Sequence, residues 1–123
     1  MKGIRDERGF TLIELIVIII ILGILSVVAV PKYLDLRADA EKGVAKGVTG
    51  ALRGSVAILH ARYLIGGSVY AIGDVVSSVE TEDITLASAG TRITATFPSA
   101  NTYGWSYTVR SGDTAAKVTP SGW

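Results

Sequence analysis

The stretch Gly9-Phe10-Thr11-Leu12-Ile13-Glu14-Leu15 joins a charged N-terminal segment to a long apolar run. From Phe10 to Val30 the only clearly polar side chains are those of Thr11, Glu14 and Ser26. A helix of this length rises roughly 31 Å, which matches the roughly 30 Å hydrocarbon core of a bilayer. The sequence therefore predicts a helix that can cross a membrane.

The organisation of the chain follows from this run. Residues 1–9 read as a leader whose basic side chains keep that end cytoplasmic, so that the C-terminal part is delivered outside. Residues 10–30 form the transmembrane and assembly helix. Residues 31–123 are long enough for one small globular head, which includes the amphipathic second half of the helix.

Composition excludes several function classes. The chain has no cysteine and one histidine, His60, so it offers no disulfide, no thiolate metal site and no site that needs two imidazoles. Without residues 1–9 it has nine basic and nine acidic side chains, which gives no electrostatic case for nucleic-acid binding. No nucleophile has a recognisable base. We therefore expect no enzyme, no cofactor and no metal.

The N-terminal residues resemble a known family. The opening stretch, with a short charged leader before it and Gly23-Ile24-Leu25 and Pro31 behind it, resembles the class III signal and N-terminal helix of type IV pilins and pseudopilins, over residues 1–40. The resemblance implies that a prepilin peptidase cuts between Gly9 and Phe10 and methylates Phe10. It also implies that Phe10, Thr11 and Glu14 serve assembly, with Glu14 neutralising the N-terminal amine of a neighbouring subunit.

The position of Glu14 in an apolar helix indicates a function even without the resemblance to pilins. A carboxylate inside an apolar helix costs about 2.5–3.5 kcal/mol at the bilayer centre and less near its edge, so it usually marks a partner or a function. The alternative is that its side chain reaches the membrane interface, since it lies only about 6 Å along the helix from Phe10. The Thr11 hydroxyl can simply bond to the helix backbone.

Two residues are expected to weaken the apolar helix. Pro31 lacks the N–H that would bond the carbonyl of Val27, so a kink or local melting is expected near residues 27–31, and Gly23 adds a second weak point. Both are also common in membrane helices. The resemblance favours a bend or unwinding when the subunit leaves the bilayer and packs in a fibre.

The segment 32–65 predicts an amphipathic helix that ends at Gly66-Gly67. Its apolar stripe comprises Val44, Val48, Leu52, Val56, Leu59 and Tyr63. A second row comprises Gly43, Gly47, Gly50 and Gly54. These glycines either permit close approach of this subunit's own sheet or of a neighbouring helix, or mark breaks in the helix.

The segment from residue 68 to Gly90 reads as a loop with one short strand. Its acidic residues Asp74, Glu80, Glu82 and Asp83 fit no calcium loop motif and favour a solvated surface. We expect Lys46, Arg53 and Arg62 to meet this loop on a neighbouring subunit.

The C-terminal third alternates with period two. The pattern predicts one strand with Ile93, Ala95 and Phe97 on the same face. It predicts a second strand with Trp105, Tyr107 and Val109 on the same face. After the turn at residues 111–114, residues 115–119 return as a third antiparallel strand. The predicted fold class is α+β, a long N-terminal helix packed on a small antiparallel sheet.

The head resembles pilins in architecture, and its stretch Tyr103-Gly104-Trp105 and the early helix from Pro31 to Ala40 most resemble the mannose-sensitive-haemagglutinin type. The chain lacks the cysteine pair that staples the C-terminal loop of many pilins. Trp123 either tucks onto the sheet or is an exposed contact residue.

Three functions follow from these features. The first is a pilus subunit, a homo-oligomer in a helical filament, whose other partners are the prepilin peptidase, the pilus assembly machinery and, before assembly, the inner membrane. The second is a type II secretion pseudopilin that forms a periplasmic piston. The third is a membrane-anchored enzyme or receptor. We expect an inner-membrane precursor and then an extracellular pilus or a periplasmic pseudopilus.

Overall fold

The computed structural model describes residues 9–123, so the predicted leader residues 1–8 lie outside the described residues. The chain divides into two compact units between Ala38 and Asp39, and both take part of helix α1 (Leu12–Gly66). The boundaries predicted at residues 9 and 30 concern processing and membrane insertion, and they stay predictions.

In the first unit, α1 presents its apolar side chains to the surroundings. An 18-residue window of the helix has a mean hydropathy of 3.2 and none of it is buried inside the molecule. The polar Ser26 is accommodated because its hydroxyl donates to the Leu22 carbonyl at 2.7 Å. Among the described residues, α1 is the one helix long and apolar enough to cross a membrane.

The backbone of α1 stays helical at both predicted weak points, Gly23 and Pro31. Local melting of residues 27–31 is therefore absent from the isolated chain. The kink at these residues, and the bend or unwinding expected on assembly, stay predictions.

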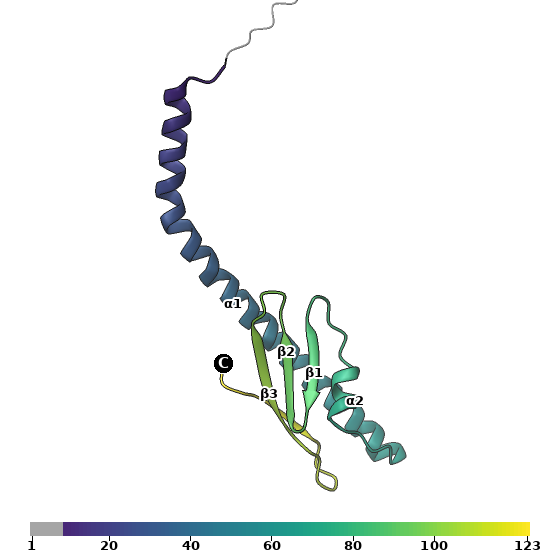
Figure 1. Ribbon diagram of the computed structural model, residues 1–123. Helices are drawn as coiled ribbons and strands as arrows, with labels where there is room; N and C mark the ends of the chain where they lie inside the picture. Colours follow the sequence, from purple (N-terminus) through teal and green to yellow (C-terminus); the bar gives the residue numbers. More distant parts are fainter. Residues whose placement is uncertain (1–8) are drawn as a thin grey trace, which may run out of the picture. The chain divides into compact units, whose positions relative to one another are not determined.

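The second unit places the C-terminal half of α1 against a four-stranded antiparallel sheet, as Figure 1 shows. The strands β1 (Thr85–Ala89), β2 (Arg92–Thr96), β3 (Thr102–Thr108) and β4 (Lys117–Pro120) are ordered β1-β2-β3-β4. The register sets Ile93 opposite Trp105 and Tyr107 opposite Val118. The predicted α+β fold is confirmed.

The core lies between α1 and one face of the sheet. From α1 it takes Ala45, Val48, Leu52 and Val56, and from the sheet side Ile93, Ala95, Phe97, Trp105, Tyr107 and Val118. Because a buried indole N–H needs an acceptor, Trp105 Nε1 donates to Thr49 Oγ1 at 2.8 Å, and the Thr49 hydroxyl donates to the Ala45 carbonyl at 2.9 Å. This chain of hydrogen bonds holds the helix on the sheet.

One position of the predicted stripe is wrong. Val44 is 47% exposed and Ala45 is buried in its place. A step of four residues advances about 40° beyond one full helical turn, so the three steps from Val44 to Val56 drift by about 120°. The observed face, Ala45, Val48, Leu52 and Val56, mixes steps of three and four, which keeps it on the sheet. Leu59 and Tyr63 do pack against the core.

The segment after Gly67 is more ordered than predicted. It contains a short helix, α2 (Ile72–Ser77), besides the expected short strand, which is β1. The Asp74 carboxylate accepts the Ala71 backbone N–H at 2.7 Å at the start of α2, and Val75 is fully buried. Six residues are too short to show a helical period, so the helix was missed.

The second strand is shorter than predicted. Since β3 ends at Thr108, Val109 lies beyond the sheet and is 61% exposed. The next residue, Arg110, places its guanidinium 3.8 Å from the centre of the Tyr63 ring, a cation–π contact that joins the hairpin to α1.

Aromatic packing holds the C-terminal residues without a disulfide. Trp123 tucks onto the sheet, with its ring edge-on to Tyr103 and Trp105 at centroid distances of 5.3 and 5.7 Å. Two hydrogen bonds to the Gly104 carbonyl, from Trp123 Nε1 at 3.1 Å and from the Ser121 N–H at 2.9 Å, fix this segment.

Candidate assembly surface

The predicted cleavage bond lies in an accessible part of the chain. Gly9 and Phe10 are exposed and precede the first residue of α1, Leu12. A peptidase needs an extended, reachable backbone, and a bond inside a helix offers neither. The local structure is compatible with cutting between Gly9 and Phe10, which stays a prediction.

Thr11 and Glu14 form a capping box at the start of α1. The Thr11 backbone N–H and hydroxyl both donate to Glu14 Oε2, at 2.9 and 2.8 Å, and the Glu14 N–H donates to Thr11 Oγ1 at 3.3 Å. These bonds satisfy N–H groups that the first turn of a helix leaves unpaired. Glu14 therefore has a local structural role besides the predicted role in assembly.

The sequence carried the signal for this cap. A Thr followed three residues later by Glu, directly before an apolar run, is the pattern of a capping box. The pair was not predicted from the sequence, because a carboxylate within an apolar helix also indicates a partner outside the helix, and that was the role predicted for Glu14.

The cap leaves half of the carboxylate available. All the hydrogen bonds of the box to Glu14 use Oε2, and within residues 9–123 Oε1 has no partner. Phe10, Ile13, Glu14, Val17 and Ile18 line a shallow open hollow of about 300 Å³. The start of α1 thus presents an apolar surface with one carboxylate oxygen ready to accept a donor from outside the subunit.

The glycine row contacts nothing in its own subunit. Gly43, Gly47, Gly50 and Gly54 lie in uninterrupted helix, which rules out breaks at these positions. No atom beyond the local helix backbone lies within 4 Å of where a Cβ would stand at any of them, which rules out close approach of the subunit's own sheet. The neighbouring helix is the alternative that remains, as a prediction.

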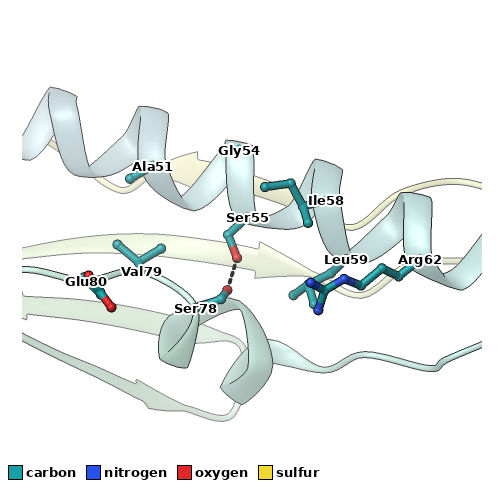
Figure 2. Close-up of a pocket in the computed structure, with 9 residues that line it drawn as sticks. All are labelled: Ala51, Gly54, Ser55, Ile58, Leu59, Arg62, Ser78, Val79 and Glu80. Atoms are coloured by element: carbon teal, nitrogen blue, oxygen red, sulfur yellow. Dashed lines mark hydrogen bonds between the residues drawn. The ribbon is translucent and has the colours of Figure 1, made fainter.

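An open groove of about 450 Å³ runs between α1 and the segment 78–80, as Figure 2 shows. At its floor the hydroxyls of Ser55 and Ser78 are hydrogen-bonded to each other, and both lie within hydrogen-bond distance of the Val75 carbonyl, so that one hydroxyl donates to the carbonyl and the other donates to its neighbouring hydroxyl. Arg62 and Glu80 lie at opposite ends of the groove (Figure 2). Arg62 therefore shares one side of its own subunit with the acidic residue it was expected to meet on a neighbour.

His60 has a packing role. Its Nε2–H donates to the Asp113 carbonyl at 3.0 Å, and its Nδ1 accepts from the Tyr70 hydroxyl at 3.2 Å. The same Tyr70 oxygen accepts the Ala116 N–H at 3.2 Å. These contacts join α1, the segment before α2 and the segment before β4. In residues 9–123 no three acidic, histidine or cysteine side chains come together in a way that could hold a metal ion.

Comparison with known proteins agrees with this geometry. The family described as the prokaryotic N-terminal methylation motif matches residues 4–30. The type IV narrow pilus major component PilA5 of Thermus thermophilus is 43% identical over 51 residues, 42% of this chain and 44% of that protein. The fimbrial protein EcpC of Eikenella corrodens is 32% identical over 98 residues, 76% of this chain and 64% of that protein.

A relative of another class matches the N-terminal part. The type II secretion system core protein G of Pseudomonas aeruginosa is 46% identical over 43 residues, 35% of this chain and 30% of that protein. The chain spans less than two thirds of the length of each of these three relatives. No solved structure matches it significantly.

These relatives do not confirm the resemblance to the mannose-sensitive-haemagglutinin type, which stays a prediction. The methylation motif, the similarity to fimbrial proteins and the exposed apolar helix with its carboxylate support the type IV pilin family as the family of this chain.

Proposed function

We propose that this chain is a structural subunit of an extracellular type IV pilus. It is made as an inner-membrane precursor, cleaved after Gly9, methylated at Phe10 and polymerised through its N-terminal helix. It is not an enzyme, binds no cofactor or nucleic acid, and works with the prepilin peptidase, the pilus assembly machinery and other copies of itself.

One observation carries the proposal. The first half of α1 is apolar and wholly unburied, and it begins with a carboxylate that keeps one oxygen free. Outside a membrane such a surface must be covered, and other copies of the same helix offer an equally apolar cover. An ionised Glu14 is tolerable in that helix bundle only beside a cation, and the amine that cleavage creates on Phe10 is such a cation.

The capping box allows a sharp test of Glu14. Glu14→Gln keeps a side-chain acceptor for the Thr11 N–H and removes the charge, whereas Thr11→Ala disrupts the cap and keeps the charge. If Glu14 acts through its charge, Glu14→Gln and Glu14→Ala both lower the yield of sheared fibres by about tenfold or more, while Thr11→Ala lowers it far less. Immunoblots of the membrane fraction check that insertion and processing are unchanged.

Two results would contradict the charge pairing. One is a fibre yield from Glu14→Gln equal to that of the unmodified chain. The other is a loss with Thr11→Ala as large as the loss with Glu14→Ala, which would assign the effect to the helix cap.

The second candidate function is a type II secretion pseudopilin, which the match to core protein G favours. Electron microscopy of cells that make this chain separates the two. A pilus subunit forms the bulk of long surface fibres that immunogold labels along their length. A pseudopilin leaves the cell surface bare, and its deletion blocks protein secretion.

A further inference from the structure

The head carries a cationic hollow at the β4 edge of its sheet. Arg53 and Lys117, both exposed, flank an apolar floor made by Val56, Ala57, Ala115 and Ala116, and the hollow has a volume of about 290 Å³. Arg53 Nε donates to the Val118 carbonyl at 3.3 Å, which anchors this cation between α1 and β4. Lys46 lies seven residues before Arg53, on the same side of the helix.

The cations of this edge are available for a partner. Within residues 9–123 neither Lys46 nor Lys117 has a hydrogen bond or an ion pair, and Arg53 contacts only a backbone carbonyl. Asp113, in the β3–β4 hairpin, has its backbone carbonyl bonded to His60 and is not among the residues that line the hollow.

An acidic turn lies at the other edge of the sheet, directly before β1. The Thr81 hydroxyl donates to the Ile84 carbonyl at 2.8 Å and closes a bend with Glu82 and Asp83 at its apex. Asp83 has a φ of 59°, a conformation that aspartate tolerates better than most residues. Both apex side chains are exposed and, in the described part of the chain, unpaired. With Glu80 they give this edge its negative charge.

We infer that the hollow between Arg53 and Lys117 is the docking site for the Glu82–Asp83 turn of a second copy of this chain. Charge identifies a second copy as the occupant. Since β4 and β1 are the two outer strands of the sheet, each copy holds a cationic hollow at one edge and an anionic turn at the opposite edge. Complementary charges of this kind set partner and register.

The arrangement also decides the symmetry. Two copies that meet through the same edge would set like charges against each other, so a closed symmetric dimer is disfavoured. Edge-to-edge contact between different surfaces is heterologous and leaves a free hollow and a free turn at the ends, so it can repeat indefinitely. This inference rests on the proposed filament and names the contact between its heads. It also replaces the expectation for Arg62, which lines the same groove of its own subunit as Glu80, at the opposite end (Figure 2).

Cross-linking tests the contact directly, because the chain has no native cysteine. Fibres of full-length Asp83→Cys/Lys117→Cys, treated with a short bismaleimide, should give a ladder of linked subunits on a denaturing gel. The control pair Asp83→Cys/Arg92→Cys, with its second cysteine at the exposed first position of β2, should stay monomeric. Adducts to a different protein, or no ladder from the test pair in intact fibres, would overturn the inference.

Charge exchange supplies an independent readout. Asp83→Lys and Lys117→Glu should each lower the yield of sheared fibres about threefold or more, since each sets like charges together, and the double variant should restore it. Arg92→Glu, which changes net charge away from both surfaces, should leave the yield near that of the unmodified chain.

The outcomes separate this inference from the proposed function. The docking site is overturned if both single variants give a normal fibre yield, or if the double variant does not restore a yield that the single variants lower. Either result leaves the proposed pilus function standing. Absence of any fibre from the unmodified chain overturns both.

Discussion

At the residue scale, Tyr107 is an exception in an otherwise well-satisfied core. Its ring is buried beneath α1, yet its hydroxyl has no hydrogen-bond partner among the described residues. A buried hydroxyl without a partner costs about 1–3 kcal/mol of desolvation. By contrast, the polar atoms of Trp105 and Thr49 in the same core are paired.

Tyr107→Phe should therefore stabilise the head by about 1 kcal/mol, seen as a higher urea midpoint for the detergent-solubilised chain. Trp105→Phe is the contrasting control, since it loses a satisfied hydrogen bond and should destabilise. A lower midpoint for Tyr107→Phe would mean that the hydroxyl has a partner.

The same residue predicts a pH dependence. Burial raises the pKa of Tyr107 above its ordinary value of 10.0, with Tyr70 and Asp74 adding to the shift and Arg110 opposing it. The folded state then holds the phenol proton more tightly than the unfolded state, so this stability is present below pH 10 and falls as the pH rises further. Tyr107→Phe should remove that part of the alkaline decline, measured as the free energy of unfolding against pH.

At the element scale, the glycine row of α1, Gly43, Gly47, Gly50 and Gly54, has open sides that face nothing in its own subunit. An isolated helix gains about 1 kcal/mol when an interior glycine becomes alanine. The glycine row therefore destabilises the isolated subunit, and no contact within the subunit offsets this cost. We expect the compensating contact in the assembled fibre, where a neighbouring helix can approach the glycines closely.

Gly50→Ala should raise the thermal midpoint of the solubilised chain, because the new methyl group meets no atom and the helix loses a flexible residue. Circular dichroism measures the change. Gly67→Ala is the matched control and should destabilise, because Gly67 ends the helix with a φ of 69° that alanine adopts with strain. A gain at Gly67 or a loss at Gly50 would contradict this assignment.

At the scale of the whole molecule, the two units meet different surroundings. The first unit exposes an apolar helix long enough to cross a membrane, whereas the second unit buries its apolar side chains in a core of its own. Trp123 closes that head by packing on Tyr103 and Trp105, a role that a disulfide fills in many pilins.

Processing is the prediction that concerns the whole chain. Mass spectrometry of the protein from fibres should find Phe10 at the N-terminus with one added methyl group, and no residue before it. Substitution of Gly9 by a bulky residue should leave the precursor in the membrane, while Gly23→Ala, a change at a glycine away from the cleavage bond, should not. A mature N-terminus at Met1, or one near Pro31, would rule out this processing.

The sequence by itself determined the long apolar helix, the similarity to type IV pilins and the α+β class, because these depend on local patterns: an apolar run of bilayer length, a short motif and periods of two or of three to four residues. It also held the capping box of Thr11 and Glu14, which lies within one helical turn.

Only the tertiary structure decided which face of α1 is buried, that β1 and α2 complete the head, and that Arg53 and Arg62 lie on different sides of it. Burial and charge placement depend on how a helix rotates over a sheet, and that rotation is set by packing between residues far apart in the chain, such as Thr49 and Trp105. For the same reason the hollow beside β4 and the acidic turn before β1 are visible only in the fold.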